Sequence, residues 1–478
     1  SRQSVRFKAR YRYTDISLFI KGLNIPTYFM KTKVLIIVSK DKKTIIGSDK
    51  AKKLVVAGEN TDTSGYENKA DTTVVKVKDN VKPKIFGSDK ADDITVDGAK
   101  VGMISTGTGD DKITVKNGGE ISTNINSGSG NDTINVDGEG TKVNGEVVKD
   151  EHGNDVKRGG ILAGDGDDTI NVTNKAEVKS GIYDGDGNDK INVKGGATVG
   201  DKDSAEAQQQ MHAGIQLGDG KNTVTVEGAD TSVSRITGYK FGEDKNGVKA
   251  ETQNDVTVKD KATVAFDIDI DNRNVDKVTV DNATVTEKIE GGHGDDIINI
   301  KNGAKVKEVK GDLDNDTIKV ADKNTHVEKV DGDKGDDTLI VENGAKVDNT
   351  VLDVGNDTKM TTTNNNGNLT INSLDKGDTI DLSKIAKVTE NINSVDASAV
   401  NNAVVNVDPK DVLDLGSENK TLEIKGGSDD TVKSKSSGQW NADGSDATHK
   451  SFTGSANDNS GVTQTVTIKV ENEVATDL

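Results

Sequence analysis

The chain of 478 residues contains no cysteine, three prolines, one tryptophan and only 3% aromatic residues. The absence of cysteine excludes disulfide bonds and thiolate metal sites. The longest apolar run near the N-terminus, residues 34–38, is far too short for a transmembrane helix. It is also shorter than the apolar region of an ordinary secretory signal. An exported protein of this sequence would therefore need another route out of the cell.

Hydrophobic residues are also scarce, at 31%, whereas glycine is abundant, with 52 residues. A composition of this kind can indicate disorder. The valine and isoleucine residues nevertheless recur periodically, and the core of a narrow solenoid needs only one or two β-branched residues per strand. We therefore expect a folded repeat array. Because such arrays grow in one dimension, the chain length does not fix the number of domains.

Acidic residues outnumber basic ones, and the formal net charge is −19 at pH 7. Many of the aspartates lie in glycine-rich turns. Stacking such turns a few ångströms apart would be strongly repulsive unless cations lay between them. The same charge argues against nucleic acid and against an anionic membrane as partners. The composition thus favours a cation-binding protein that does not insert into a membrane.

The repeating unit is clearest at residues 291–299, Gly-Gly-His-Gly-Asp-Asp-Ile-Ile-Asn. Its glycines permit backbone conformations that are closed to other residues, and they leave carbonyl oxygens exposed at the turn. The carboxylate of Asp296 stands where it could share a hard cation with those carbonyls. Ile298 alternates with polar neighbours, as in a half-buried strand. Turn, charge and strand are therefore contained in nine residues.

Variants of this unit recur at thirteen positions, most of them 18 to 22 residues apart. Three longer steps, of 36, 33 and 33 residues, indicate loops of about 12 to 16 residues inserted into single coils. A period near 20 predicts an all-β parallel β-solenoid with two or three short strands per coil and one metal-binding edge. The aligned residues are Asp93, Asp111, Asp132, Asp168, Asp189, Asn222, Asp255, Asp276, Asp296, Asp316, Asp337, Asp357 and Asp378.

The aspartates of the better-kept repeats are candidate metal ligands. Calcium is favoured over magnesium because flexible, carbonyl-rich oxygen cages suit six to eight ligands. The alternative is that these residues only cap turns without binding metal. Lys53, which stands where Asp93 does, and the degenerate repeats at Asn222, Asp255 and Asp276 are not expected to bind a cation. The predicted ligands are Asp93, Asp111, Asp132, Asp168, Asp189, Asp296, Asp316, Asp337 and Asp357.

The chain divides into an N-terminal arm (1–42), a calcium-binding β-solenoid with loop insertions (43–383) and a small C-terminal β-rich module (384–478). The basic, aromatic-rich start of the arm is either an extension upstream of Met30 or an anchor or subunit contact on the acidic rod. The first coils depart from the pattern, as expected of a cap, with Asp71 leading the coil after that of Lys53. We expect Trp440 to be a core residue of the C-terminal module.

The repeat resembles that of the RTX (repeat-in-toxin) proteins, whose signature is Gly-Gly-x-Gly-x-Asp-x-apolar-x. Residues 291–299 match every specified place, and the resemblance covers roughly residues 87–383. It implies that turn carbonyls and the motif aspartates hold calcium, and that the β-roll folds when it meets calcium outside the cell. The C-terminal residues, including 411–415 and 466–471, resemble the terminal region of large RTX adhesins, which implies type I secretion.

Catalysis has little support in the sequence. The five histidines are scattered, and neither His-Glu-x-x-His nor Gly-x-Ser-x-Gly is present. We therefore expect no enzyme but a secreted, calcium-stabilised structural protein of the bacterial cell surface, which self-associates into a surface layer or filament. An RTX-type adhesin or biofilm protein is the alternative, with cell-surface polysaccharide as a possible partner. A β-helical polysaccharide-acting enzyme is a third reading.

Overall fold

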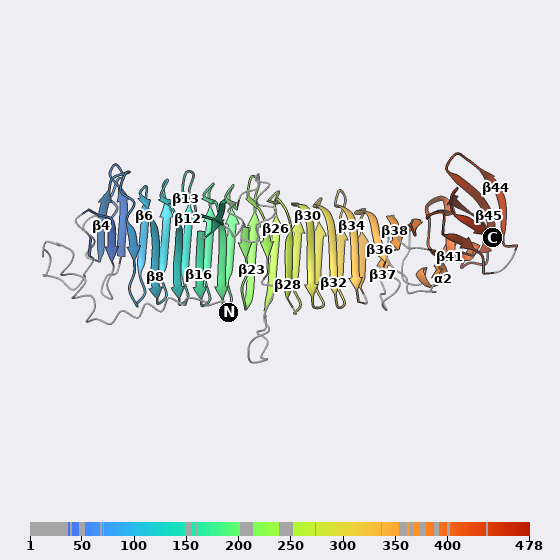
Figure 1. Ribbon diagram of the computed structural model, residues 1–478, viewed down its shortest axis with the longest axis horizontal. Coiled ribbons are helices and arrows are strands. Elements are labelled where there is room, and N and C mark those ends of the chain that lie inside the picture. The colour runs from blue at the N-terminus through green and yellow to red at the C-terminus, as the bar shows by residue number, and fades with distance from the viewer. Residues whose placement is uncertain are drawn as a thin grey trace.

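The described part of the chain forms a long rod of stacked coils made almost entirely of β-strands (Figure 1). The computed structural model describes residues 37–38, 41–46, 53–66, 69, 71–149, 155–158, 160–200, 214–238, 252–272, 274–335, 337–352, 361–363, 367–371, 379–386, 392–398, 402–435 and 438–478. The coils of the central region contribute strands to two long sheets that enclose a thin apolar core. The predicted parallel β-solenoid is confirmed.

The 14-stranded sheet takes one strand from each coil. Its neighbours pair in parallel and in register, so that Ile113 lies beside Ile134 and Val115 beside Val136. Its strands, in spatial order, are β4 (Thr72–Val77), β3 (Lys53–Gly58), β6 (Asp93–Asp97), β9 (Lys112–Lys116), β12 (Thr133–Asp137), β17 (Thr169–Thr173), β20 (Lys190–Lys194), β23 (Lys221–Glu227), β26 (Gln253–Lys259), β29 (Lys277–Asp281), β31 (Ile297–Lys301), β33 (Thr317–Ala321), β35 (Thr338–Glu342) and β37 (Thr361–Thr363).

The 27-stranded sheet takes two strands from most of the earlier coils, one of them only two residues long. From β30 onward the two merge into single strands of seven to ten residues. The short strands are β7 (Lys100–Val101), β10 (Glu120–Ile121), β13 (Lys142–Val143), β18 (Glu177–Val178), β21 (Thr198–Val199), β24 (Ser232–Val233) and β27 (Thr263–Val264). The others as far as β38 are β1 (Ile37–Val38), β2 (Thr44–Ile46), β5 (Lys84–Phe86), β8 (Met103–Thr108), β11 (Asn124–Ser129), β16 (Gly160–Asp165), β19 (Gly181–Asp186), β22 (Gly214–Gln216), β25 (Ile236–Thr237), β28 (Ile268–Asn272), β30 (Thr284–His293), β32 (Lys305–Leu313), β34 (His326–Lys334), β36 (Lys346–Leu352) and β38 (Gly367–Ile371).

The core is a stack of β-branched side chains, because successive residues of a strand point to opposite faces. In β9 the side chains of Ile113 and Val115 are fully buried, and Ile134 and Val136 repeat the pattern in β12. Each inward side chain lies beside its equivalent in the next coil. Full burial of one such side chain contributes about 1.5 to 3 kcal/mol. Two inward residues per strand, repeated along the rod, therefore compensate for the low overall hydrophobic content.

The long steps of the repeat coincide with insertions, as predicted. Between two regular coils the chain forms an antiparallel hairpin of β14 (Glu146–Lys149) and β15 (Asp155–Arg158). The coils on either side resume in register, since β11 pairs with β16 and β12 with β17. The other two predicted insertions fall largely on residues 201–213 and 239–251, which lie outside the described residues.

The N-terminal end of the rod differs from the predicted order of coils. The strand that follows Asp71, β4, pairs with one side of β3, and the other side of β3 pairs with β6. The coil of Asp71 therefore does not lie between those of Lys53 and Asp93, and that prediction is wrong. The intervening segment is held to the rod by Tyr66, whose hydroxyl donates to Asp97 Oδ2 at 2.6 Å. Most of the predicted arm, including Met30, lies outside the described residues.

Parallel pairing continues beyond residue 383. The strands β40 (Ile392–Asp396), β42 (Thr421–Lys425) and β46 (Thr463–Glu471) follow β38 in the larger sheet, and β45 (His449–Asn457) and β44 (Trp440–Ser445) add to β46 in antiparallel order. A second, four-stranded parallel sheet contains β39 (Ile380–Asp381), β41 (Val404–Asn406), β43 (Thr431–Lys433) and β47 (Ala475–Asp477). The helical elements are α2 (Leu382–Ile385), α3 (Pro409–Asp414) and the 3-10 helix η1 (Glu418–Lys420).

The tryptophan of the C-terminal region is a core residue, as predicted. The side chain of Trp440 is 6% exposed, and its indole N–H donates to the carbonyl oxygen of Val407 at 3.1 Å. No helix in the described part of the chain is long and apolar enough to cross a membrane.

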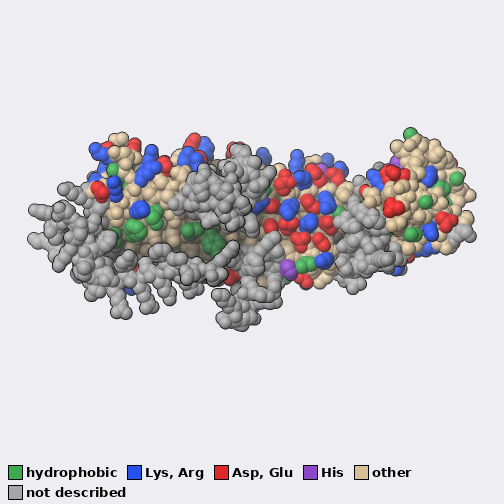
Figure 2. All heavy atoms as spheres, viewed as in Figure 1, with side chains coloured by type: hydrophobic (Ala, Val, Ile, Leu, Met, Phe, Trp, Pro, Cys, Tyr) green, Lys and Arg blue, Asp and Glu red, His purple; other side chains and the backbone are tan. Residues whose placement is uncertain are grey.

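The outer face of β30, β32 and β34 carries basic and acidic side chains in alternation (Figure 2). Lys288, Glu308 and Lys329 stand side by side on three successive coils, and Lys329 Nζ lies 2.6 Å from Glu308 Oε1. Opposite charges on neighbouring strands stabilise the sheet. The excess of negative charge on this rod is therefore not concentrated on this face.

Candidate metal site

One edge of the rod consists of the glycine-rich turns that join the larger sheet to the smaller one. The glycines there are required by the backbone. Gly164 has φ +112°, and a Cβ atom at that position would lie 1.9 Å from the carbonyl oxygen of Gly128 in the preceding coil. Only glycine tolerates both the conformation and the close approach. The turns of successive coils can therefore stack directly on one another, which brings their aspartates into line.

The aspartate at the end of each turn points into the rod and forms what we call the aspartate column. Its carboxylate Oδ1 accepts a hydrogen bond from the backbone N–H of the column residue in the preceding coil, at 2.6 to 3.1 Å. These bonds tie each coil to the next. The members of the column are Asp92, Asp111, Asp132, Asp168, Asp189, Asn222, Asn254, Asp276, Asp296, Asp316 and Asp337.

The second carboxylate oxygen is the unusual feature of the column. In six members Oδ2 is buried and has no hydrogen-bond partner, namely Asp111, Asp132, Asp168, Asp189, Asp296 and Asp316. These side chains belong to residues that are only 1 to 2% exposed. An ionised carboxylate that is buried with an unsatisfied oxygen costs several kcal/mol, so such groups bind a cation or take up a proton. The column therefore contains a row of buried carboxylate oxygens to which the protein offers no hydrogen-bond donor.

The pKa values of the column express the same cost. Burial raises the pKa of Asp168 to about 7, that of Asp316 to about 8 and that of Asp296 to about 9. The carboxylates of adjacent coils raise these pKa values further, because like charges disfavour ionisation. At neutral pH and without a cation, these carboxyls are neutral or only partly ionised.

Hydroxyl groups lie beside two of the carboxyls. Burial raises the pKa of Asp111 and Asp132, and the nearby hydroxyl groups of Thr106 and Ser127 offset part of that rise. Each hydroxyl has one hydrogen, however, and these are directed to the carbonyl oxygens of Ser127 and Ala163, both at 2.8 Å. The hydroxyls would have to rotate to serve the aspartates. Their support for the ionised column is therefore incomplete.

Asn222 shows how a position of the column is satisfied without charge. Asn222 accepts the N–H of Asp189 through Oδ1 at 3.1 Å, as an aspartate would. Its Nδ2 donates to the carbonyl oxygen of Gly218 at 3.0 Å and to Asn254 Oδ1 at 3.2 Å. The amide thus supplies a donor at the place where an aspartate has Oδ2. A carboxylate at the same place needs a proton or a metal ion to complete the same set of contacts.

The ends of the array differ from its middle. Asp92 Oδ2 accepts the backbone N–H of Ser88 at 2.7 Å. Near the C-terminus, Asp430 accepts the N–H of Ala403 through Oδ1 at 2.7 Å and that of Gly427 through Oδ2 at 2.6 Å. Backbone N–H groups therefore bond to Oδ2 at these two turns, in contrast to the six members between them whose Oδ2 has no partner.

The structure places the predicted ligands as follows. Asp111, Asp132, Asp168, Asp189, Asp296, Asp316 and Asp337 all belong to the column, and Asp357 lies outside the described residues. Asp276, from which we expected no cation, also belongs to the column.

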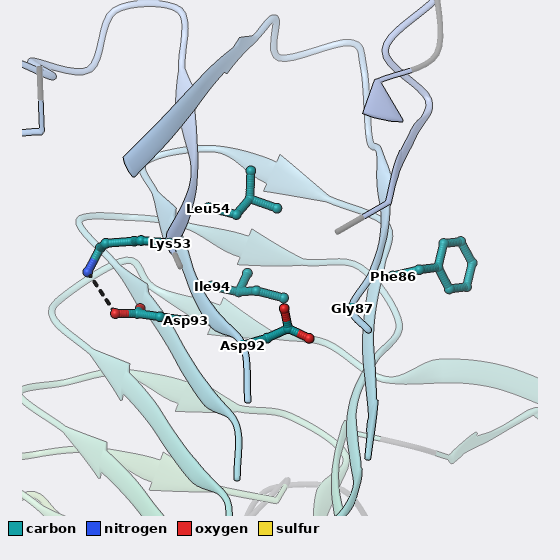
Figure 3. Close-up of a pocket in the computed structure, with 7 residues that line it drawn as sticks. All are labelled: Lys53, Leu54, Phe86, Gly87, Asp92, Asp93 and Ile94. Atoms are coloured by element: carbon teal, nitrogen blue, oxygen red, sulfur yellow. Dashed lines mark hydrogen bonds and ion pairs between the residues drawn. The ribbon is translucent and has the colours of Figure 1, made fainter. Parts of the chain in front are cut away.

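Asp93 does not belong to the column, and its alignment is wrong by one residue. It pairs with Lys112 in the register of the sheet, and its Oδ2 lies 3.2 Å from Lys53 Nζ. Figure 3 shows Asp93 turned toward Lys53, whereas Asp92 points the other way, toward Gly87. Asp255 is misaligned in the same way, because the column residue of that coil is Asn254. A residue at the position of Asp93 faces outward and cannot join the buried row.

A second row of polar side chains runs along the outside of the same edge. Asp167 Oδ1 accepts the N–H of Asn188 at 2.8 Å, and Asn131 Oδ1 accepts that of Asp167 at 2.8 Å. Asp295 accepts the N–H of Asn315 at 2.9 Å in the same manner. These residues are exposed, and asparagine and aspartate both occur among them. This outer row is a hydrogen-bonded turn ladder whose charges water can solvate.

The donor set at this edge is restricted to oxygen. Among the described residues, no group of three or more histidine, cysteine, aspartate or glutamate side chains is placed to hold a metal ion. A cation bound here would have to share one or two carboxylates with backbone carbonyl oxygens, which is the ligand type that calcium accepts. The unpartnered Oδ2 atoms fit that requirement.

No family model matches this chain. No similar curated protein and no similar solved structure was found either.

Proposed function

We propose that this protein is a secreted, calcium-stabilised structural protein of the bacterial cell surface, which self-associates into a layer or filament. The observation that carries the proposal is the row of buried carboxylates with unpartnered oxygens. Adjacent coils of a parallel stack are about 4.8 Å apart. At that distance two ionised carboxylates repel each other by about 3.5 kcal/mol at an effective dielectric constant of 20. A row of such pairs makes the ionised rod strongly dependent on a counter-ion.

Calcium is the cation that best suits this edge. The donors are carboxylate and carbonyl oxygens, and the chain offers no cysteine and only five histidines. Calcium tolerates irregular sets of oxygen ligands, whereas magnesium requires a nearly ideal octahedron. The residues that would hold it are Asp111, Asp132, Asp168, Asp189, Asp296, Asp316 and Asp337, together with turn carbonyls. When bound, the ion supplies the positive charge that the buried row lacks.

The structural role rests on the shape of the molecule and on its resemblance to RTX proteins. A long rod (Figure 1) with charged side chains on a sheet face (Figure 2) suits lateral or end-to-end association. Export by a type I route and location at the cell surface follow from the resemblance alone.

Calcium titration tests the proposal directly. We expect chelated protein at neutral pH to gain β-sheet circular dichroism and a higher melting temperature when calcium is added, and magnesium to be much less effective. An identical spectrum and melting temperature with and without calcium would contradict the proposal. Negative-stain microscopy with calcium then separates assembly from adhesion, because layers or filaments support the first, and isolated rods support an adhesin. A polysaccharide-cleavage assay examines the enzymatic alternative.

A further inference from the structure

In several coils the residue five places before the column aspartate faces the carboxyl of that aspartate. We call this place the companion position. A Cβ atom built on Gly291 would lie 2.6 Å from Asp296 Oδ2, and one built on Gly311 would lie 2.2 Å from Asp316 Oδ2. In other coils the companion is larger. The companions in the described coils include Gly87, Thr106, Ser127, Ala163, Asp184, Leu217, Gly291 and Gly311.

In the coil of Asp189 the companion is itself an aspartate. Asp184 is fully buried, and its Oδ1 accepts the backbone N–H groups of Gly185 at 2.9 Å and Gly218 at 2.7 Å. Its Oδ2 has no hydrogen-bond partner, and neither has Asp189 Oδ2. The charge of Asp189 acts directly on Asp184, whose pKa is raised well above its usual range, chiefly by burial. This coil therefore holds two inward carboxyls that share one buried space.

The surroundings of the pair offer no protein cation. Among the described residues, no lysine, arginine or histidine forms an ion pair with Asp184 or Asp189. The companion in the preceding coil is Ala163 and that in the following coil is Leu217, both fully buried and apolar. Neither can supply a donor to the two free oxygens. A buried pair of carboxylates without a partner is strongly unfavourable, whereas two carboxylates on one divalent ion leave no net charge.

We propose that Asp184 and Asp189 together hold one calcium ion within their coil, as the tightest cation site among the coils whose companion side chains are described. The inference rests on the proposed calcium function and extends it, because Asp184 stands at the first glycine place of the repeat motif, where the motif supplies no side-chain ligand. A column member with glycine, alanine or a hydroxyl residue as companion offers one carboxylate to a cation between coils. The coil of Asp184 offers two, with both free oxygens already desolvated, so less of the binding energy is lost in removing water from the ligands.

The test compares Asp184→Asn with a matched column variant, Asp111→Asn, in the full-length chain. Each protein is stripped with a chelator and titrated with calcium chloride, and stoichiometry and affinity are measured by equilibrium dialysis and calorimetry. We expect Asp184→Asn to lose the tightest class of site or to weaken it by roughly tenfold or more, since even outer-shell changes cost that much at metal sites. Asp111→Asn should keep that class and lose calcium only from the weaker sites.

Several outcomes would overturn the inference. If wild type and Asp184→Asn bind the same number of calcium ions with the same affinities, the pair is neutralised by a proton and holds no metal. If Asp111→Asn loses the tightest class instead, the site lies elsewhere in the column. If wild type binds no calcium at all, both the Asp184 site and the proposed calcium function fail. If wild type binds calcium and Asp184→Asn binds it equally well, only the Asp184 site fails. Should Asp184→Asn fold poorly by circular dichroism, Asp184→Ser replaces it, because Ser127 occupies the companion position of another coil.

Discussion

Replacing Asp296 by asparagine should have opposite effects with and without calcium. Asp296 is 1% exposed, its Oδ2 has no partner, and burial raises its pKa from 3.8 to about 9. At pH 7.5 the unfolded carboxyl is ionised, whereas the folded, metal-free carboxyl has taken up a proton. Each pH unit between 3.8 and 7.5 costs about 1.4 kcal/mol, so the folded state loses up to about 5 kcal/mol of stability through this one group.

Asparagine avoids this cost because it does not ionise and already provides a donor. Asn222 shows that the amide fits the column, with hydrogen bonds to Asp189 N–H and to the Gly218 carbonyl. We therefore expect chelated Asp296→Asn to be more stable than chelated wild type, by about 2 to 5 kcal/mol after relaxation of the surroundings. In saturating calcium this difference in stability should become smaller or change sign, because the variant has lost one carboxylate ligand.

The assay is chemical denaturation at pH 7.5, in chelator and in calcium, followed by circular dichroism. The matched control is Asp295→Asn, because Asp295 is exposed and Asn131 makes the equivalent turn hydrogen bond in another coil. The control should leave both stabilities within about 0.5 kcal/mol of wild type. The reasoning is refuted if Asp296→Asn is less stable than wild type by the same amount in chelator and in calcium. The buried carboxylate of Asp296 would then need no neutralisation.

Three further predictions follow from the same edge. The raised pKa values of Asp168, Asp296 and Asp316 mean that folded, chelated protein binds more protons than unfolded protein. Their contribution to stability is complete below about pH 4 and is lost progressively as the pH rises from there to the folded-state pKa values of about 7 to 9. Melting temperatures in chelator should therefore fall between about pH 4 and pH 9, and a rise would contradict the burial argument. Asn222→Asp removes the donor to the Gly218 carbonyl and should destabilise chelated protein by about 3 kcal/mol, a loss that calcium should reverse in thermal melts. Gly164→Ala should cost about 2 kcal/mol or more in denaturant titrations, with or without calcium, because φ is +112° and the new Cβ would meet the Gly128 carbonyl. Gly65→Ala, which meets no atom within 4 Å, should match wild type.

The solenoid could be predicted from sequence because its two signals reinforce each other. The Ile and Val residues that alternate with polar ones define the inward face, and the glycine turns set the length of a coil. In β9, Asp111 stands two places before Ile113, so both point inward by simple alternation. The stacked strands of the structure follow from this local pattern, which needs no information about distant residues.

The column errors came from pairs of adjacent acidic or amide residues. At residues 92–93 and 254–255 either member could be aligned with the motif, and the glycine pattern is too weak there to choose. Spacing to the inward strand residue decides correctly, because Asp92 lies two places before Ile94 and Asn254 two places before Val256. The same spacing places Asp276, two places before Val278, in the column, although its turn lacks the glycines of the motif.

Asp430 was missed for a different reason. The stretch Gly-Gly-Ser-Asp-Asp-Thr-Val at residues 426–432 repeats the motif, and Asp430 stands two places before the buried Val432. The glycine-poor residues between 384 and 425 suggested that the array had ended. Whether the array continues depends on which earlier strand β43 pairs with. That pairing joins residues that are distant in the sequence, so the local pattern does not reveal it. The position of β4 on the outer side of β3 was unpredictable for the same reason.

The burial of the column is a direct consequence of the repeat that builds the core. Alternation places the motif aspartate on the same side as Ile and Val, so every added coil of the central region adds a buried acid as well as apolar side chains. Backbone N–H groups bond to Oδ2 of Asp92 and of Asp430, and amides interrupt the row at Asn222 and Asn254. Two stretches of carboxyls remain on either side of these amides, and within them hydrophobic burial and charge burial oppose each other. Lengthening such a rod therefore adds apolar side chains and buried carboxyls together. The stability of the rod then depends on the protons and cations available in solution as well as on the chain.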